Sequence, residues 1–418
     1  NTLYLNFLST SCPLPNKPML RFPSKTSHKA PKVKHNLPAS KPKRVTKKAS
    51  PRPKRSISTQ PTPPKSTVYL DPNSILDKLY TKECALPHNI KLVTVDMPTK
   101  TTTIYPEARY FDLGQFSDGY HGKPNAFAPT PEAWEMSVKR LAISKDDEVI
   151  CVDRSGHLGA PRLFWYLLAG GIPADKLRIA MGGLEAFDSI MDRKSDSEEF
   201  VCEHRPEEWL DFNQRIVPDQ AAKITSDNMV KFNPATFKKY AISNEELFTI
   251  VETQKQSIDA GKWNYDLPLI IDTRGAPMFA QGHMVGALSL PYPSLLSRLG
   301  DGYGNGMTVD LDQLEPTFEK ILTTLVTKNP SKRPQIVFSC QTAQTASTGF
   351  VALYQWLKQN KELNPNAQFT LDTVDIKVYD SSYYIYGNPN IHLDDVPNCS
   401  NRRFLEAGPS SGHSLFFA

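Results

Sequence analysis

The sequence predicts an α/β fold made of two similar halves, each a mainly parallel sheet flanked by helices, with an extended basic N-terminal arm. From Thr67 onward, short apolar runs alternate with amphipathic segments, which is typical of parallel strands joined by helices. The order of these segments repeats once, in two stretches of about 140 residues. A chain of 418 residues also exceeds the roughly 250 residues that a single core can support.

The arm, residues 1–65, contains fifteen Lys or Arg and no Asp or Glu, whereas the rest has 34 basic and 44 acidic residues. It is rich in Pro and has too little apolar surface to offset the entropy cost of ordering, so we expect it to be disordered on its own. We expect it to become ordered on a partner, either RNA phosphate or an acidic protein surface; the alternative is a solvated linker. Arg- and Ser-rich segments without acids also resemble organelle transit peptides.

In the first half, three apolar runs predict strands and two segments predict helices. The helix at 130–143 has clear start signals, since Thr130 can cap it, Pro131 suits its first position and Glu132 complements the helix dipole. The second helix is almost wholly apolar and ends at two glycines. The strands are expected at 91–97, 147–153 and 176–183, and this second helix at 160–171.

The second half repeats this order and ends its central strand at a cysteine. The segment 345–358 carries apolar residues at helical spacing, as at Phe350, Leu353 and Leu357, so it predicts a helix directly after Cys340. The strands are expected at 267–274, 334–340 and 374–380, and a turn with a short strand is expected at 282–291.

Several classes of protein are excluded. No run approaches the ~20 apolar residues of a membrane span. The six cysteines are scattered, without the spacing of metal ligands, so no metal or cofactor is expected and the thiols fit a reducing compartment. The Gly-rich stretch 300–306 lacks the Lys-Ser/Thr of a phosphate loop, and Tyr303 replaces a ligand that a calcium loop needs. We expect a flexible surface loop there.

The order of four motifs resembles the tandem rhodanese family, which includes the thiosulfate and mercaptopyruvate sulfurtransferases. The motifs are IIDTR followed by GHMVGA, then IVFSC before a helix, VYDSSYYIYG at the end, and ICVDRSGHLGAP with IAMGGLEAF in the first half. The resemblance covers roughly residues 68–390 and places Asp153 where the second half has its cysteine. It implies an extension (1–66), a non-catalytic domain (67–206), a linker (207–239), a domain with Cys340 (240–392) and a tail (393–418).

The resemblance implies that Cys340 is a nucleophile. A cysteine at a strand end, before a loop of inward amides and a helix N-terminus, lies where negative charge is favoured, so its thiolate is stabilised. It would take the outer sulfur of thiosulfate or mercaptopyruvate as a persulfide. Arg274 is a further candidate for substrate binding. The expected amide cradle comprises Gln341, Thr342, Ala343, Gln344 and Thr345. A Cys-x5-Arg phosphatase is excluded because Ala346 stands at the Arg position.

The chain departs from the family pattern at several positions. Ala343 replaces a glycine, which penalises the left-handed backbone of a tight anion loop. Met278 stands where active members carry a substrate-binding Arg, so we expect Arg274 to make a structural ion pair instead. Ser381 replaces a Gly of the closing motif, and His121 is expected to be a surface histidine rather than an assisting one.

These departures lead to a functional hypothesis. The chain is expected to be a catalytically degenerate rhodanese-like protein of the mitochondrion, a structural or accessory subunit of a ribosome or respiratory complex held through residues 1–65. The alternative is an active thiosulfate or 3-mercaptopyruvate sulfurtransferase that accepts a small sulfur donor and works through a Cys340 persulfide.

Overall fold

The computed structural model describes most of the chain beyond the arm. The described residues are 68–79, 89–95, 109–111, 129–195, 224–225, 227–387, 404–410 and 413–417. The predictions for the arm (residues 1–65) and for His121 therefore lie outside the described residues. Among the described helices, none is both long and apolar enough to cross a bilayer.

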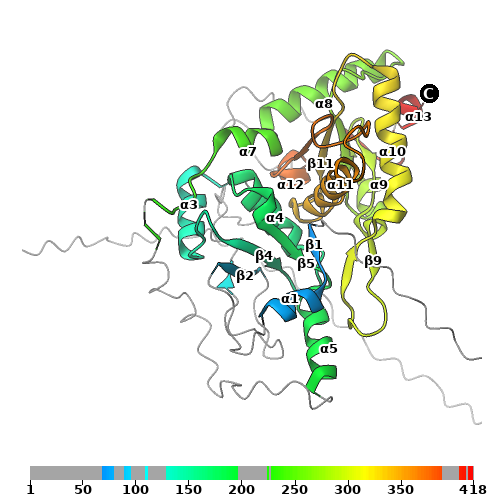
Figure 1. Cartoon of the computed structure of the whole chain (residues 1–418). Helices are drawn as coiled ribbons and strands as arrows, with labels where there is room; N and C mark the ends of the chain where they lie inside the picture. Colours follow the sequence, from blue (N-terminus) through cyan, green and yellow to red (C-terminus); the bar gives the residue numbers. More distant parts are fainter. Residues whose placement is uncertain are drawn as a thin grey trace, which may run out of the picture. The chain divides into compact units, whose positions relative to one another are not determined.

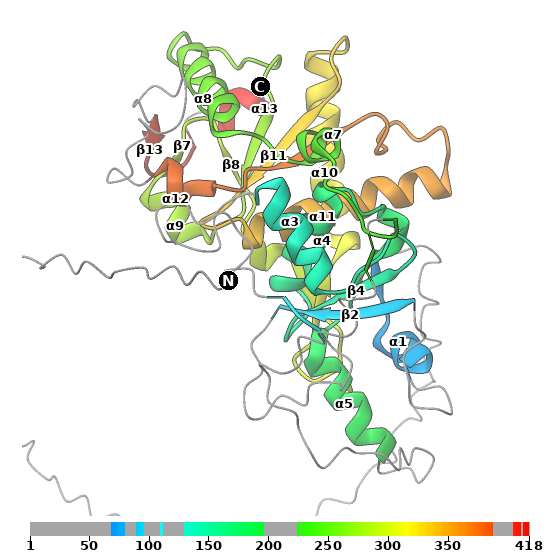
Figure 2. The ribbon, with the colours of Figure 1, turned by 90° about the vertical axis from the view of Figure 1, so that its left-hand side faces the viewer.

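The first half contains a five-stranded sheet in which every pair of neighbouring strands is parallel. Its order is β1 (Tyr69–Leu70), β5 (Leu177–Ala180), β4 (Glu148–Val152), β2 (Ile90–Thr94) and β3 (Arg109–Tyr110). The helices around it are α1 (Pro72–Leu79), α3 (Pro131–Arg140), α4 (Gly159–Gly170) and α5 (Gly183–Ser195). Figure 2 shows this sheet between α3, α4 and α5.

The second half contains a four-stranded sheet that is also wholly parallel. Its order is β12 (Asp375–Val378), β11 (Gln335–Ser339), β6 (Leu269–Asp272) and β8 (Leu288–Ser289). Its helices are α7 (Pro234–Tyr240), α8 (Asn244–Asp259), α9 (Ala276–Gln281), α10 (Leu311–Lys328), α11 (Gln344–Leu363) and α12 (Ser382–Tyr386). The predicted α/β fold with two mainly parallel sheets is confirmed (Figure 1).

Local sequence signals explain where individual helices begin. The Thr130 side chain accepts a hydrogen bond from the Ala133 amide, and Pro131 is the first residue of α3, as predicted. Helix α8 begins with a capping box, in which the Ser243 and Glu246 side chains each bind the other's backbone amide. These caps satisfy amides that have no partner within the helix.

The two halves share a core built between α4 and α11. The rings of Phe164 and Tyr354 meet edge to face at 6.0 Å between centroids. The Trp165 indole donates to the Tyr240 carbonyl oxygen at 3.0 Å. Helix α4 is buried along its whole length, which explains why its sequence is apolar on every face.

A hairpin of the second half lies on the first half. It is formed by β9 (Leu296–Arg298) and β10 (Met307–Val309), which pair antiparallel (Figure 1). The Met307 amide donates to the Ser155 carbonyl, and the Met307 carbonyl accepts from the Gly182 amide, both at 3.0 Å. The expectation of a flexible surface loop at 300–306 is therefore wrong, because this loop belongs to a hairpin fixed by backbone hydrogen bonds.

The C-terminal segment also belongs to the fold. Strand β13 (Leu405–Glu406) pairs antiparallel with β7 (His283–Met284). Helix α13 (His413–Phe417) inserts Phe416, whose carbonyl accepts a hydrogen bond from the Tyr265 hydroxyl at 2.8 Å. Residues expected to form a tail thus supply a strand and a core side chain.

Candidate functional site

Cys340 follows β11, between the neighbouring strands β12 and β6. A three-residue loop separates it from α11, which begins at Gln344. Cys340 is only 2% exposed. The structure thus has the predicted order of strand, cysteine, loop and helix, with the thiol closed off from bulk solvent.

The loop after Cys340 keeps a left-handed turn although no glycine is present. Ala343 has φ 62° and ψ 0°, a conformation that costs a residue with a Cβ about 1 kcal/mol. The Ser382 hydroxyl offsets this cost, since it accepts hydrogen bonds from the amides of Ala343 at 3.0 Å and Cys340 at 3.4 Å. The Ser347 hydroxyl donates to the Ala343 carbonyl at 2.7 Å. The substitution of glycine therefore leaves the loop strained but held.

Several backbone amides around this loop have no hydrogen-bond acceptor and could bind an anion. Within the described residues, no partner accepts from the backbone amides of Gln341, Thr342, Gln344 or Thr345. The last two are at the start of α11, where such amides carry the positive end of the helix dipole. The Thr345 hydroxyl is bonded to that of Thr273 at 2.9 Å. The predicted cradle residues thus lie together beside Cys340.

In the first half, the same kind of loop is filled by its own carboxylate. Asp153 follows β4 and is 2% exposed. Its carboxylate accepts from the amides of Ser155 at 3.0 Å and of Leu158 and Ala160 at 2.9 Å, and also from Gly156. A strand end followed by a helix start therefore stabilises a negative charge in this very fold.

Arg274 makes a buried ion pair with a neighbouring residue of its own segment. It is 4% exposed, and its Nε and Nη2 atoms bind the Asp272 carboxylate at 2.7 to 3.1 Å. Nη2 also donates to the Gly282 carbonyl at 2.7 Å, and the guanidinium carbon lies 3.7 Å from the centre of the Tyr383 ring. The predicted structural ion pair is confirmed. Met278, four residues on, is 43% exposed.

The turn that follows β12 fastens the cysteine loop. The Tyr383 amide donates to the Cys340 carbonyl at 2.8 Å, and the Tyr384 amide donates to the Gln341 carbonyl at 3.0 Å. Just before this turn, Asp380 forms a buried ion pair with Arg162 of α4. Sequence reasoning missed Ser382 and Arg162. The available signal for Arg162 was a single charge inside an otherwise apolar helix.

The first half also covers the start of α11. The Thr348 hydroxyl donates to the His157 carbonyl at 2.6 Å. The His157 ring stacks on Tyr292 of the 3-10 helix η4 (Tyr292–Leu295), with 6.5 Å between ring centroids. The backbone around Cys340 is thus enclosed by elements of both halves.

Burial raises the pKa values of two ionisable groups near these loops. Burial raises the pKa of the Asp380 carboxyl, and the Arg162 guanidinium opposes that rise. Burial and the nearby Asp153 raise the pKa of the Cys151 thiol, so this thiol stays protonated and is unreactive. Among the described residues, no three His, Cys, Asp or Glu side chains gather as metal ligands.

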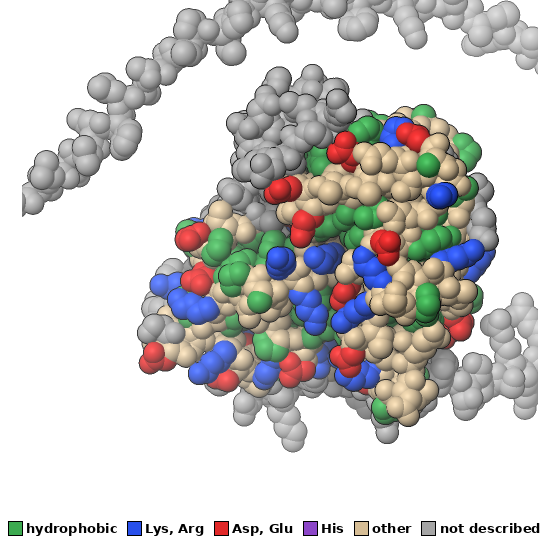
Figure 3. All heavy atoms as spheres, turned by 90° about the horizontal axis from the view of Figure 1, so that it is seen from above, with side chains coloured by type: hydrophobic (Ala, Val, Ile, Leu, Met, Phe, Trp, Pro, Cys, Tyr) green, Lys and Arg blue, Asp and Glu red, His purple; other side chains and the backbone are tan. Residues whose placement is uncertain are grey.

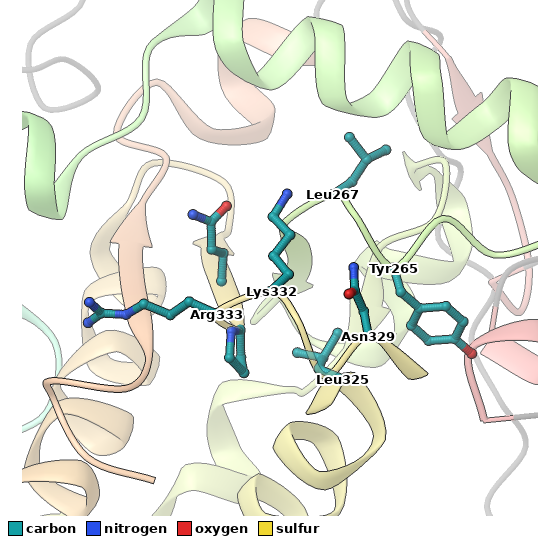
Figure 4. A pocket seen from close by; sticks show the side chains of 8 residues that line it. Tyr265, Leu267, Leu325, Asn329, Lys332 and Arg333 are labelled. Carbon is teal, nitrogen blue, oxygen red and sulfur yellow. The ribbon is translucent and has the colours of Figure 1, made fainter. Parts of the chain in front are cut away.

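A small hollow at the start of β11 lies at the opposite end of the strand from Cys340. It holds only about 10 Å³ and is lined by Tyr265, Leu267, Leu325, Asn329, Lys332, Arg333, Pro334 and Gln335 (Figure 4). Its charged groups are occupied, since Lys332 donates to the Asp266 carbonyl and Arg333 pairs with Asp375 at 3.1 Å. This hollow is too small and too internally bonded to hold a sulfur donor.

Comparison with known proteins finds sequence similarity to sulfurtransferases. The chain is 24% identical to the 3-mercaptopyruvate sulfurtransferase of Escherichia coli over 284 residues, 68% of this chain and 79% of that protein. It is 33% identical to the thiosulfate sulfurtransferase TUM1 of Saccharomyces cerevisiae over 79 residues, 19% of this chain and 25% of that protein. The chain is thus similar in sequence to two sulfurtransferases.

Two solved structures are also similar to this chain. SseA from Escherichia coli aligns with a TM-score of 0.46 at 18% identity, covering 76% of this chain and 99% of SseA. The sub-stoichiometric sulfur transferase subunit of yeast mitochondrial complex I aligns with a TM-score of 0.45 at 16% identity, covering 76% of this chain and 95% of that subunit. No family model matches the sequence.

Proposed function

We propose that this chain is a catalytically degenerate rhodanese-like protein that serves as a structural or accessory subunit of a larger mitochondrial assembly. The observation that carries the proposal is the state of Arg274, whose guanidinium is bonded to Asp272 and Gly282 and stacked on Tyr383. A cation would hold a sulfonate or carboxylate donor through charge-assisted pairs, which are among the strongest contacts that a protein offers, and Arg274 is already engaged.

The environment of Cys340 supports the same proposal. A sulfur-transfer thiol must meet a small donor and then an acceptor, yet Cys340 is 2% exposed. Sites fail when the groups that touch the substrate are not held in a productive arrangement. A buried thiol, together with an Arg274 guanidinium that is already engaged, fits a structural role better than turnover.

The proposed mitochondrial location and partner rest on the arm. Residues 1–65 carry fifteen basic and no acidic residues, a composition suited to import and to binding an acidic or RNA surface. On the face seen in Figure 3, basic and acidic side chains instead lie side by side. The arm is therefore the proposed contact with a ribosome or a respiratory complex.

Persulfide formation tests the loss of activity. Purified chain is given thiosulfate or 3-mercaptopyruvate, and the mass of Cys340 peptides is compared with that of the Cys340→Ser variant. We expect no added sulfur under conditions in which the Escherichia coli 3-mercaptopyruvate sulfurtransferase gains one. Turnover that disappears in Cys340→Ser would defeat the degenerate assignment.

The arm is tested by co-purification from mitochondria. The full chain is compared with a chain lacking residues 1–65 and with one in which the arm's Lys and Arg are replaced by Gln. We expect a large assembly to co-purify with the full chain alone. Equal recovery with all three would remove the arm from the proposal without affecting the activity test.

A second function is favoured by one observation, the unpaired amides after Cys340. In this hypothesis Cys340 is the nucleophile of an active sulfurtransferase, and the anionic donor is bound by the free amides of the predicted cradle, those of residues 341, 342, 344 and 345. For Cys340 to react, the loop would have to open and expose the sulfur atom to the donor. The same mass measurement distinguishes the two functions.

A further inference from the structure

A cavity separate from the cysteine loop lies at the edge of the second sheet. It encloses about 380 Å³ between the edge strand β8 and the helices α10 and α13. Helix α13 lies beside α10 near the C-terminus of the chain (Figure 1). Its lining residues are Ile271, Leu288, Ser289, Leu290, Pro316, Thr317, Lys320, Ile321, His413 and Phe417.

The cavity combines an apolar floor with a cationic rim. Ile271, Leu288 and Ile321 are each at most 5% exposed and form the buried apolar part of the lining. Lys320 and His413 are exposed, and no Asp or Glu belongs to the lining. A pocket of this kind suits a ligand with an apolar body and a negative head.

The outer wall is a fixed part of the fold. The Phe417 ring has the Lys320 ammonium 4.4 Å from its centre and the His413 ring 5.1 Å away. The preceding Phe416 is fully buried and anchored through the Tyr265 hydroxyl. The cavity is therefore built by packed side chains, and its aromatic wall is held in contact with a positive charge.

The position of the cavity separates it from Cys340. In the sheet, β6 lies between β8 and β11, and Cys340 follows β11. The cavity is lined from β8 and β6 outward and does not include the cysteine loop. Occupation of one site therefore does not require the other.

We propose that this cavity binds a small amphipathic anion, an unbranched carboxylate of about eight to ten carbons. Its volume is at the lower end of the range of about 300 to 1,000 Å³ that is typical of ligand pockets. A volume of about 380 Å³ therefore suits a ligand at the small end of that range. The alkyl chain lies on Ile271, Leu288 and Ile321, and the carboxylate faces Lys320.

Calorimetric titration of the full chain with octanoate tests this proposal. We expect a dissociation constant below about 1 mM, with octanol about tenfold weaker and octyltrimethylammonium without binding. Equal binding of octanoate and octanol would overturn the anionic selectivity, and absence of octanoate binding would overturn the site.

Two lysines on one helix provide a matched pair of variants. Lys320→Met removes the charge at the rim but keeps an apolar stem beside Phe417. Lys328→Met removes an exposed charge of α10 that does not line the cavity. We expect octanoate affinity to fall about tenfold in the first and to stay unchanged in the second. An equal effect in both would show that binding is not at this cavity.

Filling the cavity gives an independent check. Ile321→Trp places a large side chain in the apolar floor, and Thr317→Phe does so from the partly buried wall, where folding is less at risk. We expect either variant to lose octanoate binding while its circular dichroism remains native. Native-like Thr317→Phe with unchanged octanoate affinity would contradict the proposal.

Discussion

Arg162 and Asp380 form an ion pair between the two halves in which the side chains are only 3% and 4% exposed. Arg162 belongs to α4, and Asp380 lies two residues after the end of β12 and two residues before Ser382. The hydroxyl of Ser382 holds the loop after Cys340. This pair therefore connects the core of the first half to the backbone around the cysteine of the second.

Breaking this pair is expected to be strongly destabilising. In Arg162→Met the Asp380 carboxylate stays buried without its counter-charge, which costs about 3 to 5 kcal/mol in the free energy of unfolding. Urea unfolding at neutral pH measures this cost. Arg162→Met combined with Asp380→Leu should recover most of it, because no buried charge remains. A single variant as stable as the native chain would contradict this view of the pair.

The cost of Arg162→Met should depend on pH. Burial raises the pKa of Asp380, and the variant loses the guanidinium that opposes this rise. A carboxyl with a raised folded pKa keeps full stability below its unfolded pKa of about 3.9 and loses it as pH rises through the folded pKa. The deficit of the variant should therefore shrink from pH 7 toward about pH 4.5. The double variant, which lacks both charges, is the control and should show no such change.

Local features of the fold were predictable from the sequence, and long-range contacts were not. The cap at Thr130, the helix after Cys340 and the ion pair of Arg274 follow from neighbouring residues or from the family motif. The periodicity of apolar residues does not indicate which distant element a side chain contacts. Arg162 was therefore predicted only as part of an apolar helix. For the same reason the 300–306 loop was misjudged, because its contacts lie more than 100 residues away. The catalytic role of Cys340 stays a prediction.

The packing of the β9–β10 hairpin on the first half leads to a prediction about Gly156. Gly156 has φ +88°, and a Cβ there would lie 2.6 Å from the Gly182 amide nitrogen and 2.9 Å from the Met307 carbonyl oxygen. Gly300 has a similar φ of +95° but nothing within 4 Å. Gly300→Ala should cost about 1 kcal/mol from backbone strain alone, and Gly156→Ala about 3 kcal/mol or more because the hairpin must also shift. Thermal unfolding of both variants compares them, and equal costs would exclude the steric explanation.

Alanine substitution should destabilise the loop after Asp153 more than the loop after Cys340. Asp153→Ala leaves four amides, two buried and two partly buried, without their shared acceptor, so we expect a loss of about 3 kcal/mol in the free energy of unfolding. Cys340→Ala removes one sulfur atom from a site whose bonded amides are held by Ser382, so we expect a loss of about 1 kcal/mol. Denaturant unfolding measures both. If Cys340→Ala lost more stability than Asp153→Ala, the thiol itself would be the main stabilising group.

Introducing a cation at Met278 tests the proposed reason for a loss of sulfur transfer. Met278 is 43% exposed, so Met278→Arg introduces a charge without burying it. If the missing cation limits donor binding, the Met278→Arg variant should form the Cys340 persulfide about tenfold faster with thiosulfate. Met136→Arg is the matched control, because Met136 is an exposed methionine of the first half, at 55%. An equal rate in the two variants would show that burial of Cys340, rather than loss of a cation, prevents sulfur transfer.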